Sequence, residues 1–359
     1  MKKCCSAKAF TIIELMVSIF ITVTIIASFY KLYDASVRTE RSASIRVAVN
    51  LMGEQMIDTI AESIRLMGLN SVKSDYLEST GADGNVGIIR HAGEYKFVYL
   101  SPYGSPITKV KTAESNFPSC KFKLFNTAAF YNGVNKLYFH NEDGFFKTVS
   151  VGTPTYLSDG IQVNVTFSEN DKYNTIGCEQ VFPEGSLVTG EDFVYTLEYT
   201  SGGTGSTNSL TLSYAKESSA VGVTDGTLVD FSYNPENNNN YYSMPKFVLE
   251  YLVESCTEEN ETVVCQRNWK TPKSSVLEAE DVKGMIAVRF GFILLSRKER
   301  VYSGSDTPGS LPTYCIFKSD NDQDYYCDTL PSLNYTASVF RKVVYLANYR
   351  FLKDQTPVE

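Results

Sequence analysis

A single carboxylate, Glu14, lies near the start of the apolar segment "AFTIIELMVSIFITVTIIASFY", which spans residues 9–30. An unpaired ionised side chain inside a membrane helix costs roughly 2–3 kcal/mol on insertion scales, so Glu14 is expected to have a partner. The nearest cation in the sequence is Lys8, which lies more than one helical turn before Glu14 and outside the apolar run. Three roles stay open for the carboxylate: tolerance near the membrane interface, pairing with a charge on another chain, and proton relay.

Proteolysis of the chain could supply the missing positive charge. A cut between Ala9 and Phe10 would create an α-amino group on Phe10, four residues before Glu14. That amine could meet the carboxylate of its own chain or of a neighbouring subunit.

Residues 10–30 are predicted to cross a membrane as a helix. Glu14 is the only charged residue in this run of 21. At ~1.5 Å rise per residue, a helix of that length covers roughly 32 Å, enough for a bilayer's hydrocarbon core. The preceding Lys2, Lys3 and Lys8 predict a cytoplasmic N-terminus and export of the remaining chain. A secretory signal peptide is the alternative, but its apolar core is shorter and a small-residue cleavage site follows it.

An amphipathic continuation of the same helix is predicted over residues 31–70. Apolar residues recur there at spacings of three and four, which is the pattern of one helix face. This stripe consists of Ile45, Val49, Met52, Met56, Ile60, Ile64 and Met67. With Gly68 as a candidate C-cap, we expect one helix from about Phe10 to about Met67, whose outer half lies on a globular head.

A β-rich head is predicted for residues 71–359. Segments such as "YKFVYL", "FFKTVSV" and "IQVNVTF" alternate apolar and polar residues, and turn signals such as "NEDG" separate them. The polar stretch "PENNNNYY" marks a loop that could divide the head into two sub-lobes near residues 235–245. The predicted fold class is therefore α+β, a long N-terminal helix packed on a mostly antiparallel head.

The cysteine content favours disulfide bonds in an exported head. Beyond Cys4 and Cys5, the chain has Cys120, Cys178, Cys256, Cys265, Cys315 and Cys327. An even number in an exported domain suggests a disulfide framework, and six cysteines allow 15 connectivities. Neighbour pairing is the simplest hypothesis: Cys120–Cys178, Cys256–Cys265 and Cys315–Cys327. Zinc is disfavoured, because these cysteines form no C-x-x-C pair and the chain has only two histidines.

Charge and motifs argue against nucleic-acid binding and against catalysis. The formal net charge is −8, and loss of three leader lysines would make the chain more acidic. Nucleic-acid affinity depends largely on basic contacts to phosphate. The sequence contains no hydrolase, zinc-protease, phosphate-loop or dinucleotide signature, so no enzyme and no cofactor are expected.

A calcium loop is a weaker alternative at "SDNDQDYYCD". Asp320, Asp322 and Asp324 alternate there as in an EF-hand. Tyr325 stands where that loop needs glycine, and Pro331 stands where it needs glutamate. An acidic, solvated loop is the preferred interpretation.

The N-terminal residues resemble those of type IV prepilins and type II secretion pseudopilins. The shared features are a basic leader, the small residue Ala9, then Phe-Thr-x-x-Glu and an apolar run. The resemblance implies that a membrane peptidase removes residues 1–9 and methylates the new N-terminal Phe10. It further implies that Glu14 neutralises the N-terminal amine of a subunit already in the filament. Ala9 departs from the usual glycine, and the first part of the helix lacks the proline of many major pilins.

Three further segments are similar to PilW-type minor pilins, with type II secretion pseudopilins of the GspJ type as a close alternative. They are "EQMIDTIAESIRLMGLN" at 54–70, "VKGMIAVRFGFILLSRKE" at 282–299 and "FRKVVYLANYRF" at 340–351. The resemblance implies a type IV pilin-like fold and a structural subunit of the tip complex that primes pilus assembly. Twitching motility, adhesion or DNA uptake would lie downstream. A pilus-tip adhesin or DNA-binding module is the alternative function.

The same resemblance implies partners and a location. The partners are the prepilin peptidase, other minor pilins, the major pilin and the inner-membrane pilus assembly machinery. Before assembly the chain would cross the bacterial inner membrane once, with its head facing the periplasm. After assembly the head would lie at the pilus tip, at the cell surface.

We predict that the mature chain begins at N-methylated Phe10. Intact-mass measurement and N-terminal peptide mapping of membrane-extracted protein test this. Residues 1–9 found still attached, in cells with an active prepilin peptidase, would contradict the prediction.

Overall fold

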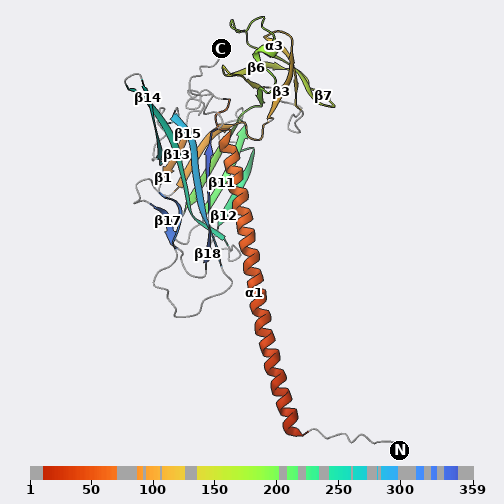
Figure 1. Ribbon diagram of the computed structural model, residues 1–359, viewed down its shortest axis with the longest axis vertical. Helices are drawn as coiled ribbons and strands as arrows, with labels where there is room; N and C mark the ends of the chain where they lie inside the picture. The colour runs from red at the N-terminus through yellow and green to blue at the C-terminus, as the bar shows by residue number, and fades with distance from the viewer. Residues whose placement is uncertain are drawn as a thin grey trace, which may run out of the picture.

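The fold is α+β, with one long N-terminal helix and an antiparallel β head, as the sequence predicts (Figure 1). The helix leaves one end of the head, and a smaller lobe lies at the opposite end. The computed structural model describes residues 11–70, 87–91, 94–105, 107–125, 136–201, 208–216, 224–233, 242–259, 262–272, 281, 284–297, 313–318, 325–329 and 335–346.

Helix α1 runs without interruption over Ile12–Arg65, 54 residues in all. Gly68 turns the chain into the head: its φ is +69°, and its N–H donates to the carbonyl of Leu100 at 2.8 Å. Glycine takes this left-handed conformation without steric cost, which suits it to the end of a helix. The predicted apolar stripe lies in the core. Val49, Met56, Ile60, Ile64 and Met67 are buried, and Ile45 and Met52 pack against them.

Two antiparallel sheets form the larger lobe. The first has the strand order β1 (Gly87–His91), β2 (Glu94–Ser101), β10 (Phe193–Ser201), β11 (Asn208–Lys216) and β12 (Gly226–Tyr233). The second has the order β14 (Thr262–Lys270), β13 (Tyr242–Glu259), β15 (Met285–Arg297) and β18 (Tyr335–Tyr345). Both sheets and the outer half of α1 contribute to one hydrophobic core.

Helix α1 closes one open side between the two sheets. It contacts β18 and β15 of the second sheet and β12 and β2 of the first. Gly53 allows a very close approach to Phe340, since a Cβ at that position would lie 2.2 Å from the ring. Asp58 forms an ion pair with Lys342 at 2.9 Å along the same contact. The helix is therefore part of the head's core and not an arm beside it.

The smaller lobe is inserted into a hairpin of the first sheet. Strands β2 and β10 pair with each other up to the pair Ser101↔Phe193. The chain between them forms a second core of its own, which includes Phe122, Phe139 and Phe182. Its elements are β3 (Ile107–Glu114), β4 (Ser119–Leu124), β5 (Tyr138–His140), β6 (Phe145–Val151), β7 (Thr155–Leu157), β8 (Gly160–Phe167), α3 (Cys178–Val181) and β9 (Leu187–Thr189).

Six of these strands close into a barrel. The pairing runs β3–β9–β5–β6–β8–β4, and β4 in turn pairs with β3, so the ring is complete. All of these pairs are antiparallel. Strand β7 pairs with β8 beside β6. Closure leaves these six strands without a free edge, which protects an inserted module against edge-to-edge association.

The expected division near residues 235–245 falls between the two sheets, where the chain passes from β12 to β13. Those sheets share one core. The lobe with a separate core is formed instead by residues between Ser101 and Phe193.

A buried polar cluster joins the barrel to the end of the helix. Asn70 donates to the carbonyl of Gly190 at 3.1 Å and to Oδ1 of Asp192 at 2.8 Å. Its Oδ1 accepts from Thr189 Oγ1 at 2.6 Å and lies 3.0 Å from Nε2 of His140. Because an amide oxygen can only accept, Nε2 of His140 carries the proton. Both the nitrogen and the oxygen of the Asn70 amide are thus hydrogen-bonded to the smaller lobe, and these bonds link it to the end of the helix.

Burial lowers the pKa of His140 to about 4, so the ring is neutral in the folded chain. Below the ordinary value of 6.5, the unfolded chain takes up a proton that the folded chain excludes. This contribution to stability is complete above pH 6.5 and is lost as the pH falls towards 4.

We predict that His140→Gln, which keeps an amide donor near Nε2, flattens this pH dependence. Between pH 6.5 and 4.5 the wild-type free energy of unfolding should fall by about 1–2 kcal/mol more than that of the variant. Denaturant titrations of the full chain in detergent, followed by circular dichroism, measure the difference. Equal pH slopes for both proteins would refute the role of His140.

Candidate functional site

The start of α1 is organised around Thr11 and Glu14. Thr11 is the N-cap, and its Oγ1 accepts from the N–H of Glu14 at 3.3 Å. The Glu14 carboxylate reaches back, and its Oε2 accepts from the N–H and from the hydroxyl of Thr11, both at 3.0 Å. These reciprocal bonds form a capping box, which satisfies donors that a helix start otherwise leaves unpaired.

The capping box holds the carboxylate at the positive end of the helix dipole, beside the expected cleavage point. Both hydrogen bonds from Thr11 end on Oε2. Among the hydrogen bonds of the described residues, Oε1 takes part in none, so it can accept from a cation. A carboxylate fixed in this way suits an ammonium group that approaches along the helix axis.

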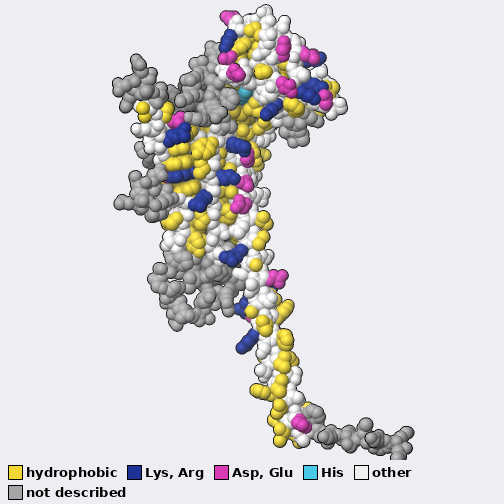
Figure 2. All heavy atoms as spheres, in the orientation of Figure 1, with side chains coloured by type: hydrophobic (Ala, Val, Ile, Leu, Met, Phe, Trp, Pro, Cys, Tyr) yellow, Lys and Arg dark blue, Asp and Glu magenta, His cyan; other side chains and the backbone are white. Residues whose placement is uncertain are grey.

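Apolar side chains cover the helix beyond this cap and face outward. The segment has the length and composition of a membrane span, and its most apolar part is not buried within the chain. Figure 2 shows these hydrophobic side chains along the part of the helix that extends from the head. The exposed residues include Ile12, Ile13, Leu15, Met16, Phe20, Ile26, Phe29, Tyr30 and Leu32.

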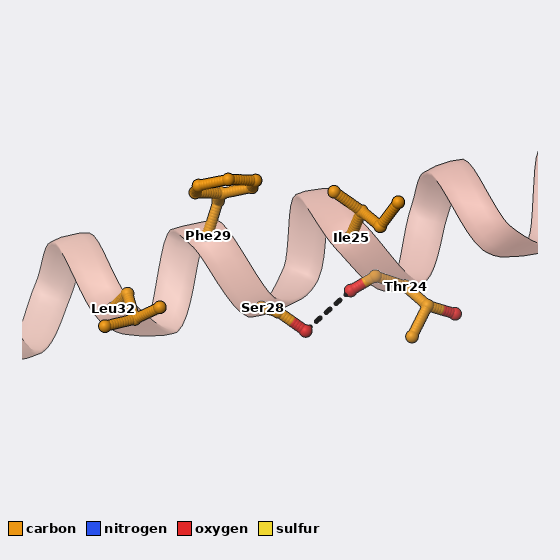
Figure 3. Close-up of a pocket in the computed structure, with 5 residues that line it drawn as sticks. All are labelled: Thr24, Ile25, Ser28, Phe29 and Leu32. Atoms are coloured by element: carbon orange, nitrogen blue, oxygen red, sulfur yellow. Dashed lines mark hydrogen bonds between the residues drawn. The ribbon is translucent and has the colours of Figure 1, made fainter.

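The hydroxyl side chains of this segment are satisfied within the helix. Thr22 donates to the carbonyl of Ser18 at 2.7 Å, and Ser28 donates to the carbonyl of Thr24 at 2.8 Å. Figure 3 shows Ser28 and Thr24 beside Ile25, Phe29 and Leu32, which line a shallow, mostly apolar groove. With its polar groups bonded internally, this surface can lie in lipid or against other helices at little desolvation cost.

Several residues singled out from the sequence lie outside the described part of the chain. These are Ala9 and Phe10 at the expected cut, and Asp320, Asp322 and Asp324 of the weaker calcium alternative. Within the described residues, no group of three or more His, Cys, Asp or Glu side chains is arranged to hold a metal ion.

The six cysteines beyond the leader form three disulfides between sequence neighbours, in agreement with the simplest pairing. They are Cys120–Cys178, Cys256–Cys265 and Cys315–Cys327. The first bridge is buried and joins β4 to α3 inside the barrel lobe. The second joins β13 to β14, and the third joins β16 (Thr313–Lys318) to β17 (Tyr325–Thr329). Each bridge therefore stabilises one local unit.

The β16–β17 hairpin packs on the outer face of the second sheet. Ile316 of the hairpin is buried against Val248 and Ile293. Beside them, Tyr326 donates to Oε1 of Glu250 at 2.7 Å, and Arg289 forms an ion pair with the same carboxylate. A buried ion pair that is fully hydrogen-bonded favours a defined geometry more than it adds stability. We read this cluster as structural.

Two features of functional interest were not predicted from the sequence. The N-cap role of Thr11 could have been predicted, because a Thr followed three residues later by Glu, before an apolar run, is the capping-box pattern. The Asn70–His140 cluster had none, because its partners lie 70 residues apart.

Comparisons with known proteins give distant likenesses. No protein-family model matches the sequence, and a search of curated proteins gives no match. Among solved structures, a type IV-like pilin from Thermus thermophilus is 13% identical, with a TM-score of 0.23 over 60% of this chain and 86% of that chain. A conserved domain protein from Bacillus anthracis is 9% identical, with a TM-score of 0.13 over 78% of this chain and 94% of that chain.

Proposed function

We propose that this chain is a minor pilin, a structural subunit of the tip complex that primes a type IV pilus. The observation that carries the proposal is that the two halves of α1 have different surroundings. Its outer half is built into the core of the head, while its inner half is apolar, exposed and headed by a fixed carboxylate. A helix of this kind can stay in a membrane before assembly and can then pack against other helices.

The proposed partner of Glu14 is the N-terminal amine of Phe10, first in its own chain and then in a neighbouring subunit. The capping box supports this role, since it fixes the carboxylate against Thr11, the residue that follows Phe10 in the sequence. In a low-dielectric environment each charge lowers the cost of burying the other, and removal of one leaves the other unpaired.

The proposal also includes the processing of the chain, its partners in assembly and the functions of the assembled pilus. A prepilin peptidase would process the chain and methylate Phe10, and the inner-membrane assembly machinery would insert it beside other minor pilins and the major pilin. Membership of a PilW-type group, as distinct from a GspJ-type pseudopilin, rests on the resemblance of segments 54–70, 282–299 and 340–351. Motility, adhesion or DNA uptake would be downstream functions.

We predict that Glu14→Gln blocks assembly. Glutamine can keep the capping box but removes the charge, so the variant tests pairing separately from helix capping. Membrane insertion and cleavage should persist, while recovery in sheared filaments and crosslinks to partner pilins should fall about 30-fold, as expected for a loss of about 2 kcal/mol.

Thr11→Ala is the matched control, because it loses the cap hydroxyl but keeps the carboxylate. It should assemble far better than Glu14→Gln, once mass spectrometry has established that both are cleaved. Normal filament recovery of cleaved Glu14→Gln would show that the Glu14 charge is not the assembly determinant.

A further inference from the structure

We propose that the outward face of β3, β4 and β8 on the barrel binds an acidic polysaccharide whose carboxylates are separated by hydroxyl groups. We call this surface the lysine face; it is formed by Lys111, Lys121, Lys123, Phe125, Gln162 and Asn164. Figure 2 shows basic side chains, with acidic ones among them, on the side of the smaller lobe where Figure 1 labels β3 and β7.

Strand register places the members of the lysine face on one surface. Along β4, Phe122 and Leu124 point into the barrel core and are fully buried, so Lys121 and Lys123 point outward between them. Lys121 lies directly opposite Asn164 on β8, and Lys123 lies opposite Gln162. Lysines and neutral amides therefore alternate across neighbouring strands.

Positive charge exceeds negative charge on this face. Lys111 and Lys123 share one carboxylate, that of Asp159, at 3.0 and 2.8 Å. Lys121 lies 3.4 Å from Glu114, and Lys109 adds a further exposed cation on β3. Hydrogen bonds from Lys123 and Lys111 lower the pKa of Asp159 to about 2, so this carboxylate stays ionised and holds both ammonium groups in place.

Outside the lysine face the described part of the barrel is mostly acidic, although Lys136, Lys147 and Lys172 also lie there. Acidic side chains lie mainly in the segments outside β3 and β4, at Glu142, Asp143, Glu169, Asp171, Glu179 and Glu184. The chain as a whole carries a net charge of −8. An anionic partner is therefore attracted to the lysine face and repelled by the other described acidic surfaces.

An exposed aromatic ring completes the surface. Phe125 comes directly after the end of β4 and is 44% exposed. The ammonium group of Lys111 lies 5.8 Å from its ring centroid. An exposed ring provides an apolar platform for the hydrophobic face of a sugar, while Gln162 and Asn164 can both donate to and accept from hydroxyl groups.

This mixture fits an acidic glycan better than DNA. Duplex DNA carries one charge per ~1.7 Å, and its binding proteins neutralise many phosphates at once. The lysine face has few cations, no arginine, and two carboxylates, Glu114 and Asp159, within it. Sparse charges interleaved with neutral hydrogen-bonding groups match a polymer with carboxylates spaced between hydroxyl groups.

The barrel lies at the end of the molecule away from the start of α1 (Figure 1). Display of the lysine face to the outside rests on the proposed function, because it requires the chain to reach a pilus tip. Binding itself is measured on the dispersed full chain, so its failure is separate from a failure to assemble.

The test is titration of the full chain in detergent with an oligogalacturonate, by isothermal calorimetry at low and physiological salt. We expect saturable binding that weakens with salt. Lys121→Gln/Lys123→Gln should weaken it at least tenfold, and Phe125→Ser should weaken it without changing its salt dependence. Lys136→Gln/Lys147→Gln is the matched control, since it removes the same charge from exposed positions elsewhere on the barrel, and it should bind like wild type.

Three results would overturn the proposal. They are no saturable binding at low salt, equal weakening by the two double variants, or tighter binding of a 20-base-pair duplex DNA than of the oligogalacturonate. Circular dichroism melts of every variant establish that a loss of binding is not a loss of folding.

Discussion

The packing of one continuous helix in two different surroundings is the constraint on which the rest of this structure depends. The outer half of α1 fills the opening between two β-sheets, where Ile60 and Ile64 are fully buried. The inner half has no protein partner among the described residues, and its side chains are apolar. A helix that is packed into the head along one half and exposes apolar side chains along the other is compatible with anchoring in a membrane.

The head contains two separate hydrophobic cores, one in the larger lobe and one in the barrel. The larger core includes α1, because buried residues of the helix pack in one cluster with residues of both sheets. The barrel core does not, because its ring of strands is closed and its bridge Cys120–Cys178 is internal. The two meet at Asn70, which follows the end of α1 and whose amide bonds to Gly190 and His140 of the smaller lobe. An inserted, self-contained barrel can vary its outer surface without disturbing the helix packing.

Local patterns predicted much of this architecture. The three-and-four spacing of apolar residues gave the extent of α1, and period-two alternation located strands such as Phe145–Val151. Closure of the barrel could not be predicted, because it depends on pairs such as Ile107↔Thr189, which are distant in the sequence. The buried state of His140 is equally non-local. The lysine face could not be predicted either, because its lysines are far in the sequence from the amides that lie beside them.

The central claim is that the outer half of α1 and the sheets of the larger lobe form a single cooperative unit. Amide hydrogen exchange of the full chain in detergent tests this most directly, because it reports the opening free energy of each segment. Helix amides between Gly53 and Ile64 should exchange within about tenfold of those in the centre of β15, through the same global unfolding event. Rapid exchange of these helix amides while β15 stays protected would contradict the account, because the helix would then open independently of the head.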